Sequence, residues 1–349
     1  MKKYKAISKI FSPRKWLVES PYINSNPNFA ILSHTKPSRQ ILHFSEYLKQ
    51  CREHSHLTQE RLTSDLYSFD IDTFEGIQTT TISKWEREIT QPKLSKQISI
   101  IKYFQQKTGT ALPCWENYTV EEAEELICRE GIHNLLGKSK KYIYDFPSEM
   151  LSVDDMKVYP LRNSERMDAL LDANMLVHQS FNHPYTQISR QQFREWAFHP
   201  ESLFLACEYK DNFLGLFFSI RVKPEVFEKI LNFKMKKSDI AENDFASSDE
   251  PGSNLMLSFF ALNEKVAILL FVRYYAYLIT NQKVIDEIGG VTIQDEAKKI
   301  VANMNLDYAD SKVTDDNVEI EAYRQTLPNL LASENSVKML LSKGECPEE

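Results

Sequence analysis

Leu57-Thr58-Gln59-Glu60-Arg61-Leu62 opens a stretch of the chain that closes with Thr79-Thr80-Thr81-Ile82-Ser83-Lys84-Trp85-Glu86-Arg87 and then Pro92. Thr58 is a good N-cap residue, so a helix is expected to begin at Gln59. A second helix is expected to begin near Gln78. Ile82 and Trp85 lie three residues apart on it and should both face inward. The stretch therefore predicts two short helices, of which the second presents a polar face.

The polar face of the second helix carries groups that can read DNA. The first residues of a recognition helix touch base edges. Glutamine can read adenine, threonine can contact a thymine methyl group, and lysine can reach guanine or a phosphate. A glutamine at the start of the first helix can reach a phosphate. The candidate DNA contacts are Gln59, Gln78, Thr79, Thr80, Thr81, Ser83, Lys84 and Arg87. The alternative for any one of them is a solvated surface position.

This stretch resembles the Cro/repressor-type (XRE) helix-turn-helix family over residues 41–110. The residues that match are Arg52, the Leu57-Thr58-Gln59 start, the Thr81–Arg87 helix, and Pro92 followed by a capped helix. The resemblance implies a duplex DNA operator as partner, and a structural ion pair between Arg52 and Glu86. One departure is the added segment 68–76. We expect Phe69, Ile71 and Phe74 to bury it, with its acidic residues pointing outward.

The composition is that of an ordinary globular protein, with 42% hydrophobic and 26% charged residues. No apolar run approaches the ~20 residues of a membrane span. No apolar stretch of the signal-peptide kind follows the first lysines. The five cysteines are scattered without a CxxC pair, which indicates reduced thiols in a cytoplasmic protein and no zinc site. The histidines match no zinc spacing, so we expect no metal.

The net charge of −7 is unevenly distributed. Residues 1–110 contain 17 Lys and Arg against 10 Asp and Glu, and most of this excess lies in residues 1–40. A basic N-terminal part on an acidic body favours contact with phosphate.

The pattern of elements predicts a multidomain protein of α and α+β class. We expect five segments: a basic extension at 1–40, the helix-turn-helix domain at 41–110, a helical connector at 111–157, a mixed α/β domain at 158–330 and a C-terminal tail at 331–349. Within the connector, Thr119 can cap a helix rich in glutamate. In the mixed domain, residues 236–253 are polar and acidic, and we expect them to form a mobile loop.

The mixed domain is predicted to run strand, helix, hairpin, strand, long helix, strand, helix. In this order it resembles the GCN5-related N-acetyltransferase (GNAT) fold, most closely in the hairpin of residues 204–216 and in residues 288–306. Acetyltransferases of this fold place a glycine-bearing loop before the long helix, where free N–H groups hold the pyrophosphate of coenzyme A. The corresponding residues here are Asn263-Glu264-Lys265-Val266-Ala267, which include no glycine. We therefore expect no acetyl-coenzyme A site, no cofactor and no enzymatic activity.

The sequence as a whole favours a bacterial-type transcriptional regulator that acts as a homodimer. The GNAT-like domain would then serve dimerisation, sensing of an unidentified small-molecule effector, or both. The candidate effector-binding residues are Phe260, Leu262, Tyr274 and Tyr277, although an aromatic cluster on an apolar helix is also typical of a core. One alternative is an N-acyltransferase with a DNA-targeting domain. Another is a phage or plasmid repressor that has no small ligand.

Overall fold

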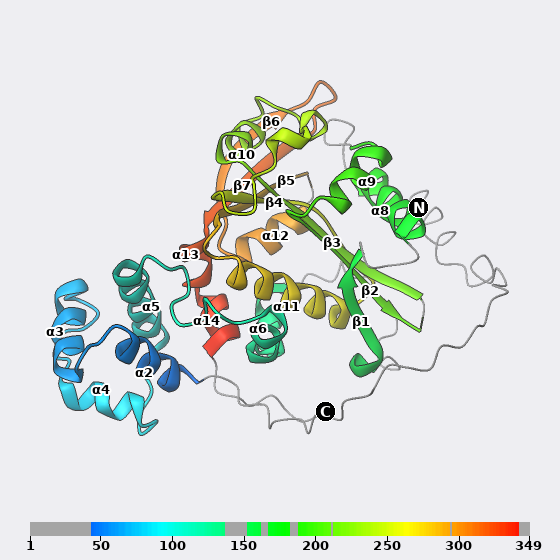
Figure 1. Cartoon of the computed structure of the whole chain (residues 1–349). Helices are drawn as coiled ribbons and strands as arrows, with labels where there is room; N and C mark the ends of the chain where they lie inside the picture. Colours follow the sequence, from blue (N-terminus) through cyan, green and yellow to red (C-terminus); the bar gives the residue numbers. More distant parts are fainter. Residues whose placement is uncertain are drawn as a thin grey trace. The chain divides into compact units, whose positions relative to one another are not determined.

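The computed structural model describes residues 43–136, 152–161, 167–181, 188–210, 212–293 and 295–341. The expected basic extension at 1–40 lies outside these residues, as do residues 342–349. The described residues comprise an N-terminal all-α region and a C-terminal region of mixed α and β structure (Figure 1). The predicted fold class is confirmed.

The described part of the N-terminal region contains four helices: α2 (Phe44–His54), α3 (Gln59–Phe69), α4 (Thr79–Glu86) and α5 (Leu94–Thr108). The Thr58 hydroxyl accepts a hydrogen bond from the Arg61 N–H, which sets the start of α3. Helix α5 ends at Gly109, whose φ of 71° belongs to the left-handed region that glycine adopts without strain. The helices enclose one apolar core, formed by Phe44, Tyr47, Leu48, Leu62, Leu66, Ile82, Trp85, Ile101 and Phe104.

The segment between α3 and α4 departs from expectation. Phe74 is fully buried as predicted, but Phe69 and Ile71 are exposed by 37% and 56%. The Asp70 carboxylate was expected to point outward. It instead accepts hydrogen bonds from the Thr73 N–H at 3.0 Å and from the Ser99 hydroxyl at 2.8 Å. A capped turn anchored by a single phenylalanine therefore replaces the expected three-residue apolar contact.

The next helices are α6 (Val120–Leu126) and α7 (Arg129–Leu136). Thr119 and Glu122 form a complete capping box at the start of α6, as the sequence predicts for Thr119. Helix α7 packs against α14 (Glu334–Leu341), which follows α13 (Leu327–Leu331). A Cβ on Gly131 would collide with the backbone of Met339, so this close helix contact requires glycine. Helix α14 lies in the segment expected to be a tail, and most of its side chains are buried.

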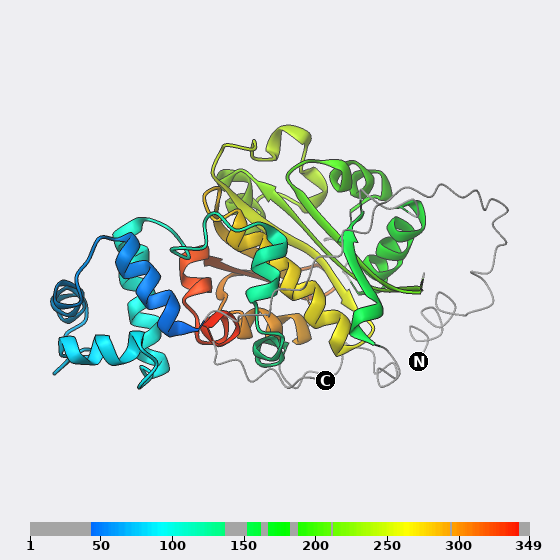
Figure 2. The same cartoon turned by 60° about the horizontal axis from the view of Figure 1, so that its bottom comes forward.

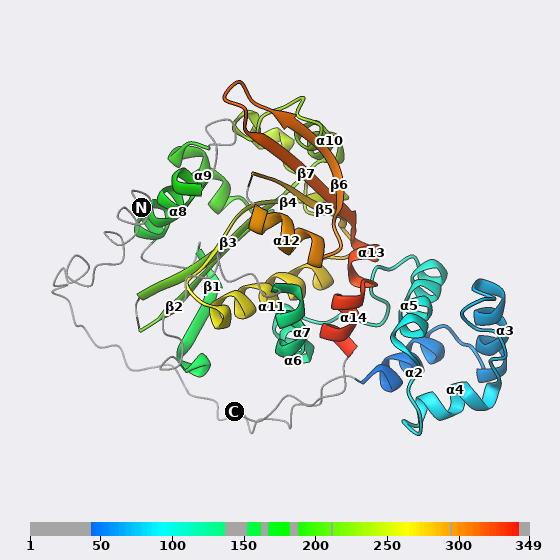
Figure 3. The same ribbon diagram turned by 180° about the vertical axis from the view of Figure 1, so that it is seen from behind.

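The C-terminal region contains one seven-stranded sheet of order β1-β2-β3-β4-β5-β7-β6. Every neighbouring pair is antiparallel except β4 and β5, which are parallel. Figure 3 shows the hairpin of β6 and β7 at one edge of this sheet. The strands are β1 (Met156–Pro160), β2 (Ser202–Tyr209), β3 (Asn212–Val222), β4 (Gly252–Ala261), β5 (Ile285–Thr292), β6 (Asp307–Val313) and β7 (Glu319–Thr326).

Helices cover both faces of the sheet (Figure 2). Phe217 of β3 packs on Tyr274 of α11 (Glu264–Thr280), with ring centroids 4.2 Å apart. Its neighbour Phe218 points to the opposite face, where it packs on Phe193 of α9 (Arg190–Phe198). The remaining helices are α8 (Met167–Phe181), α10 (Pro224–Leu231) and α12 (Asp295–Asn303). The predicted order of strands and helices is found from β1 to α12, with α9 and α10 in addition, and the strands β6 and β7 follow it.

The parallel pairing of β4 and β5 is short. It ends at Met256 and Gly290, whereas β4 continues to Ala261. Beyond that point the two strands no longer pair with each other, although β4 still pairs with β3 and β5 with β7. Helix α11 begins directly after β4 and returns the chain to β5, so its N-terminus lies at the end of β4 that pairs with β3 but not with β5.

Candidate nucleic-acid interface

Helix α4 has one buried and one exposed side. Ile82 and Trp85 are buried, as predicted from their spacing. The exposed residues are Gln78, Thr80, Lys84 and Arg87, and the half-buried ones are Thr79, Thr81 and Ser83. These are the residues of α4 that the sequence offers as DNA contacts.

The N-terminus of α4 is open to an anion. Gln78 occupies the N-cap position but makes no side-chain capping bond, and the first turn contains no acidic residue. The positive end of the helix dipole therefore faces no carboxylate of its own first turn, which favours approach to a phosphate.

An ion pair fixes the C-terminus of α4. The Arg52 Nε donates to Glu86 Oε1 at 2.6 Å, and its Nη2 donates to Glu86 Oε2 at 3.1 Å. Both side chains are largely withdrawn from solvent, with 13% and 5% exposure. The hydrogen bonds to Glu86 raise the pKa of Arg52. The structural pairing of Arg52 and Glu86 that the family resemblance implied is confirmed.

Gln59 is part of the same cluster. Its side-chain Nε2 donates to Glu86 Oε2 at 2.7 Å, so this residue links the start of α3 to the end of α4. Residue spacing alone gave no sign of this bond. Gln59 is half-buried and remains a candidate phosphate contact.

Charges on the exposed face of α4 are available to a partner. Residues 41–110 contain nine Lys and Arg and nine Asp and Glu, so the module itself is neutral. Arg61 and Lys107 both lie within ion-pair distance of Asp65, at 2.9 and 3.7 Å. Among the described residues, Lys84 and Arg87 form no ion pair; Arg87 Nε donates to the Ser83 carbonyl oxygen at 3.2 Å. Lys84 and Arg87 therefore place two positive charges without an ion-pair partner among the described side chains on the exposed side of α4.

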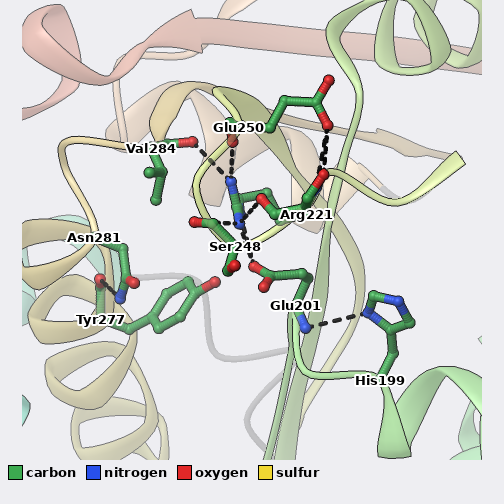
Figure 4. Close-up of polar contacts among 9 residues, drawn as sticks. His199, Glu201, Arg221, Ser248, Glu250, Tyr277, Asn281 and Val284 are labelled. Carbon is green, nitrogen blue, oxygen red and sulfur yellow. Dashed lines mark hydrogen bonds and ion pairs between the residues drawn. The ribbon is translucent and has the colours of Figure 1, made fainter.

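The four candidate effector residues do not share one surface. Phe260 and Leu262 are buried at the end of β4, where Phe260 pairs with Leu216. Tyr274 is fully buried, and its hydroxyl donates to Asn254 Oδ1 at 2.8 Å. Tyr277 points instead toward Arg221, which pairs with Asn254 (Figure 4). Leu216 and Arg221 lie five residues apart on β3, or roughly 16 Å.

Tyr277 belongs to a buried polar cluster around Arg221 (Figure 4). The Arg221 Nε donates to Glu201 Oε2 at 2.9 Å. The terminal nitrogens of Arg221 donate to Glu201 and to backbone carbonyl oxygens of Ser247, Ser248, Glu250 and Val284. Burial raises the pKa of Tyr277 to about 12. All the donors of the guanidinium have acceptors within the protein, so the cluster has the character of a structural anchor.

This anchor corrects the expectation of a mobile loop at residues 236–253. The loop contains two short 3₁₀ turns, Lys237–Asp239 and Glu242–Asp244, and Arg221 binds the carbonyl oxygens that follow them. His199 supports the same region by stacking on Phe245, with ring centroids 3.9 Å apart. The buried Arg221 guanidinium thus donates to carbonyl oxygens of the loop, while acidic side chains of the loop accept from its backbone N–H groups.

The start of α11 is capped by a side chain of the protein itself. The Asn263 side chain is buried, and its Oδ1 accepts the Val266 N–H at 2.9 Å, so the protein itself caps this helix. A Cβ on Gly215 would lie 2.6 Å from Val266 Cγ1, which shows how tightly the first turn packs on β3. One of the N–H groups that a phosphate would need is thus occupied, and Glu264 follows it.

Two further classes of site find no support in the part of the chain that the structure describes. None of its helices is long and apolar enough to cross a membrane. The described side chains also include no group of three or more His, Cys, Asp or Glu that could hold a metal ion.

No protein-family model matches the chain, and no curated protein matches it. Of the solved structures that match the chain, three each cover about half of it. FeeM, an N-acyl amino acid synthase from uncultured soil microbes, is 10% identical over 50% of this chain and 91% of its own, with a TM-score of 0.35. An N-acetyltransferase from Staphylococcus aureus Mu50 is 8% identical over 49% and 97%, with a TM-score of 0.31. The aminoglycoside N(6')acetyltransferase from Legionella pneumophila subsp. pneumophila str. Philadelphia 1 is 6% identical over 52% and 97%, with a TM-score of 0.28. Likeness at this level says nothing about what the chain binds or catalyses.

Replacing Glu86 by alanine should destabilise the helical region. The change leaves the Arg52 guanidinium largely buried without its carboxylate and removes the partner of Gln59, a loss of about 3 kcal/mol. Glu53→Ala is the matched control, because Glu53 meets the same arginine at 3.4 Å from an exposed position and should cost under about 1 kcal/mol. Thermal unfolding of the two variants measures the difference. Unchanged stability in Glu86→Ala together with an altered operator preference would contradict the structural role.

Replacing Arg221 by methionine should unfold the C-terminal region at lower denaturant concentration. The change leaves Glu201 and several loop carbonyls without their donor, which costs about 3–5 kcal/mol. Glu201→Gln keeps an acceptor at the same place and should cost less. Urea denaturation of the two variants provides the comparison. A loss below about 1 kcal/mol in Arg221→Met would show that the loop does not depend on this anchor.

Proposed function

We propose that this protein is a sequence-specific DNA-binding transcriptional regulator of cytoplasmic, bacterial type. The observation that carries the proposal is the geometry of α4. Its exposed side presents Gln78, Thr80, Lys84 and Arg87, and its opposite side is buried and tied through Glu86 to α2 and α3. A short helix held rigidly by one side, with a polar outer side, suits the major groove.

Base contacts and phosphate contacts come from different residues in this proposal. Gln78 and Thr80 lie at the start of α4, where a recognition helix meets base edges. Lys84 and Arg87 carry the unpaired charge toward the end of the helix and reach guanine or phosphate. The extension at 1–40 contains eight Lys and Arg against one Glu, which adds affinity for any duplex.

The C-terminal domain has a supporting role in the same proposal. Single helix-turn-helix modules bind DNA weakly, and pairing two of them on neighbouring half-sites supplies affinity and specificity. We assign this pairing to the mixed α/β domain, with sensing of a small effector as a second role. The enzymatic alternative, an N-acyltransferase with a DNA-targeting domain, is disfavoured by the filled start of α11.

Substitutions on α4 should weaken operator binding. Thr80→Ala and Lys84→Ala are each expected to cost ~1–3 kcal/mol of specific affinity, because each removes a groove contact. The operator is first selected from a random DNA pool with the full chain, and band shifts then give the affinities. Lys102→Ala is the matched control, because it removes an exposed lysine from α5 and should leave the operator affinity unchanged.

The double variant Thr80→Ala with Lys84→Ala sharpens this test. If its affinity for the selected operator equals that of the unmodified chain, α4 is not the reading helix. If its affinity falls equally for operator and random duplex, α4 contacts only the phosphate backbone.

Acetyl-coenzyme A should not bind at micromolar concentrations. The Asn263 cap and the packing of Val266 occupy the place where a pyrophosphate would meet the N-terminus of α11. Titration calorimetry on the full chain is expected to show no heat of binding. Glu264→Gln removes the carboxylate but leaves the cap, and it should show none either. Micromolar binding by the unmodified chain, or acetyl transfer to any amine, would favour the N-acyltransferase hypothesis over the regulator.

A further inference from the structure

Strand β6 is the outermost strand of the sheet, and one of its sides is open. Within the described residues it pairs with β7 on its other side (Figure 3). Tyr308 and Val313, near the two ends of the strand, have exposed fractions of 58% and 59%. The open edge of a strand carries N–H and C=O groups on which a further strand can pair. The β6 edge is therefore a candidate interaction surface.

The hydrogen bonds of the β6–β7 hairpin show which backbone groups of β6 face outward. The Thr314 N–H donates to the Val318 carbonyl oxygen at 2.9 Å, so residue 314 faces β7. In an antiparallel pair, residues that bond across alternate with residues that do not, so the backbone groups of Ser311 and Val313 face away from β7. The Ser311 N–H is accordingly bound by the neighbouring Asp310 carboxylate at 2.8 Å.

Two copies of this edge can meet antiparallel about a two-fold axis in only a few registers. Because the outward groups belong to residues 311 and 313, an axis near the middle of the strand passes through residue 310, 311 or 312. An axis at 310 places Asp310 across from Asp310 of the second copy, and an axis at 312 places Lys312 across from Lys312. An axis at Ser311 instead places Asp310 of each copy across from Lys312 of the other.

We propose that β6 pairs with β6 of a second copy of this chain, antiparallel, about a two-fold axis at Ser311. Directly opposed residues in an antiparallel sheet have Cβ atoms about 5 Å apart, where unlike charges stabilise the pair and like charges destabilise it. The Asp310 and Lys312 side chains therefore select this register. Asp310 leaves its own Ser311 N–H, which then donates to the Ser311 carbonyl oxygen of the second copy.

This contact deepens the proposed function, since it names the surface that pairs two chains on DNA. The regular part of β6 begins after a bulge between Tyr308 and Asp310, so the paired segment is short. Small contacts of this kind belong to weak or transient complexes. We therefore expect a dimer with a dissociation constant in the micromolar range in the absence of DNA.

The test is sedimentation of the full chain without DNA over the micromolar range, so its outcome does not depend on operator binding. The unmodified chain should show a monomer–dimer equilibrium. Lys312→Asp places only carboxylates at the contact, and Asp310→Lys places only ammonium groups there. Each should weaken the dimer by about tenfold or more. Lys102→Asp is the matched control, because it reverses an exposed charge on α5 and should leave the dimer unchanged.

An equimolar mixture of Lys312→Asp and Asp310→Lys separates a direct contact from an indirect effect. Each chain then faces unlike charges on the other, so the mixture should form dimers that contain one chain of each kind. Their dissociation constant should approach that of the unmodified dimer. A contact made elsewhere on the chain would not be recovered by mixing. Circular dichroism checks that both variants are folded.

Carbodiimide cross-linking of the unmodified chain decides the matter even if a variant fails to fold. The reagent joins a carboxylate to a neighbouring amine as an amide, with loss of water. In a mixture of unlabelled and ¹⁵N-labelled chains, the expected product links Asp310 of one chain to Lys312 of the other.

Four outcomes would overturn the proposal. They are a chain that stays monomeric throughout the micromolar range, a dimer that both charge variants leave unchanged, a mixture of folded variants that stays monomeric, and a cross-linked dimer without the link between residues 310 and 312. Loss of operator binding with an intact dimer would count against the proposed DNA contacts and leave the β6 contact standing.

Discussion

The Glu86 carboxylate is the constraint on which the arrangement of the first helices depends. It lies at the end of α4, and it accepts hydrogen bonds from Arg52 of α2 and Gln59 of α3. A nearly buried carboxylate is costly unless donors surround it, so the three side chains are held to one geometry. The segment 68–76 lengthens the link between α3 and α4 beyond a tight turn. The polar cluster at Glu86 therefore fixes an angle that the connecting chain alone would leave open.

A second set of polar contacts joins these helices to the C-terminal region. Gln105 near the end of α5 donates to the carbonyl oxygen of Pro328 at 2.8 Å, and Gln282 binds both backbone groups of Leu112. Amide side chains suit this task because each offers a donor and an acceptor to exposed backbone groups. The segment after α5 is therefore bound in place and does not act as a flexible linker.

Sequence could predict the elements whose signals are local. A threonine cap, a glycine stop and an apolar stripe are enough to identify α3, α5 and α11, since those features act within a few residues. The features that sequence missed depend on partners far away in the chain. Helix α14 packs against α5 and α7. The loop at 236–253 is held by hydrogen bonds from Arg221 to backbone carbonyl oxygens, which any residue type could provide. The same contrast between local and distant contacts holds for the candidate nucleic-acid interface on α4. The buried and exposed sides of α4 were predictable, whereas the bond from Gln59 to Glu86 was not, and the choice of bases stays a prediction.

The start of α11 is closed by the packing of Val266 on Gly215 and by the Asn263 cap. A glycine in the loop before a helix leaves room for an anion at the helix N-terminus. In this chain the glycine lies across from that helix, at Gly215 of β3, and the space it frees is filled by Val266 from α11 itself. The first turn packs against the sheet, and the Asn263 side chain caps it by accepting the Val266 N–H. The packing of Val266 and the Asn263 cap both fill space at the N-terminus of α11 with groups of the protein itself. Under the proposed function, this domain contributes by pairing two copies of the chain on DNA.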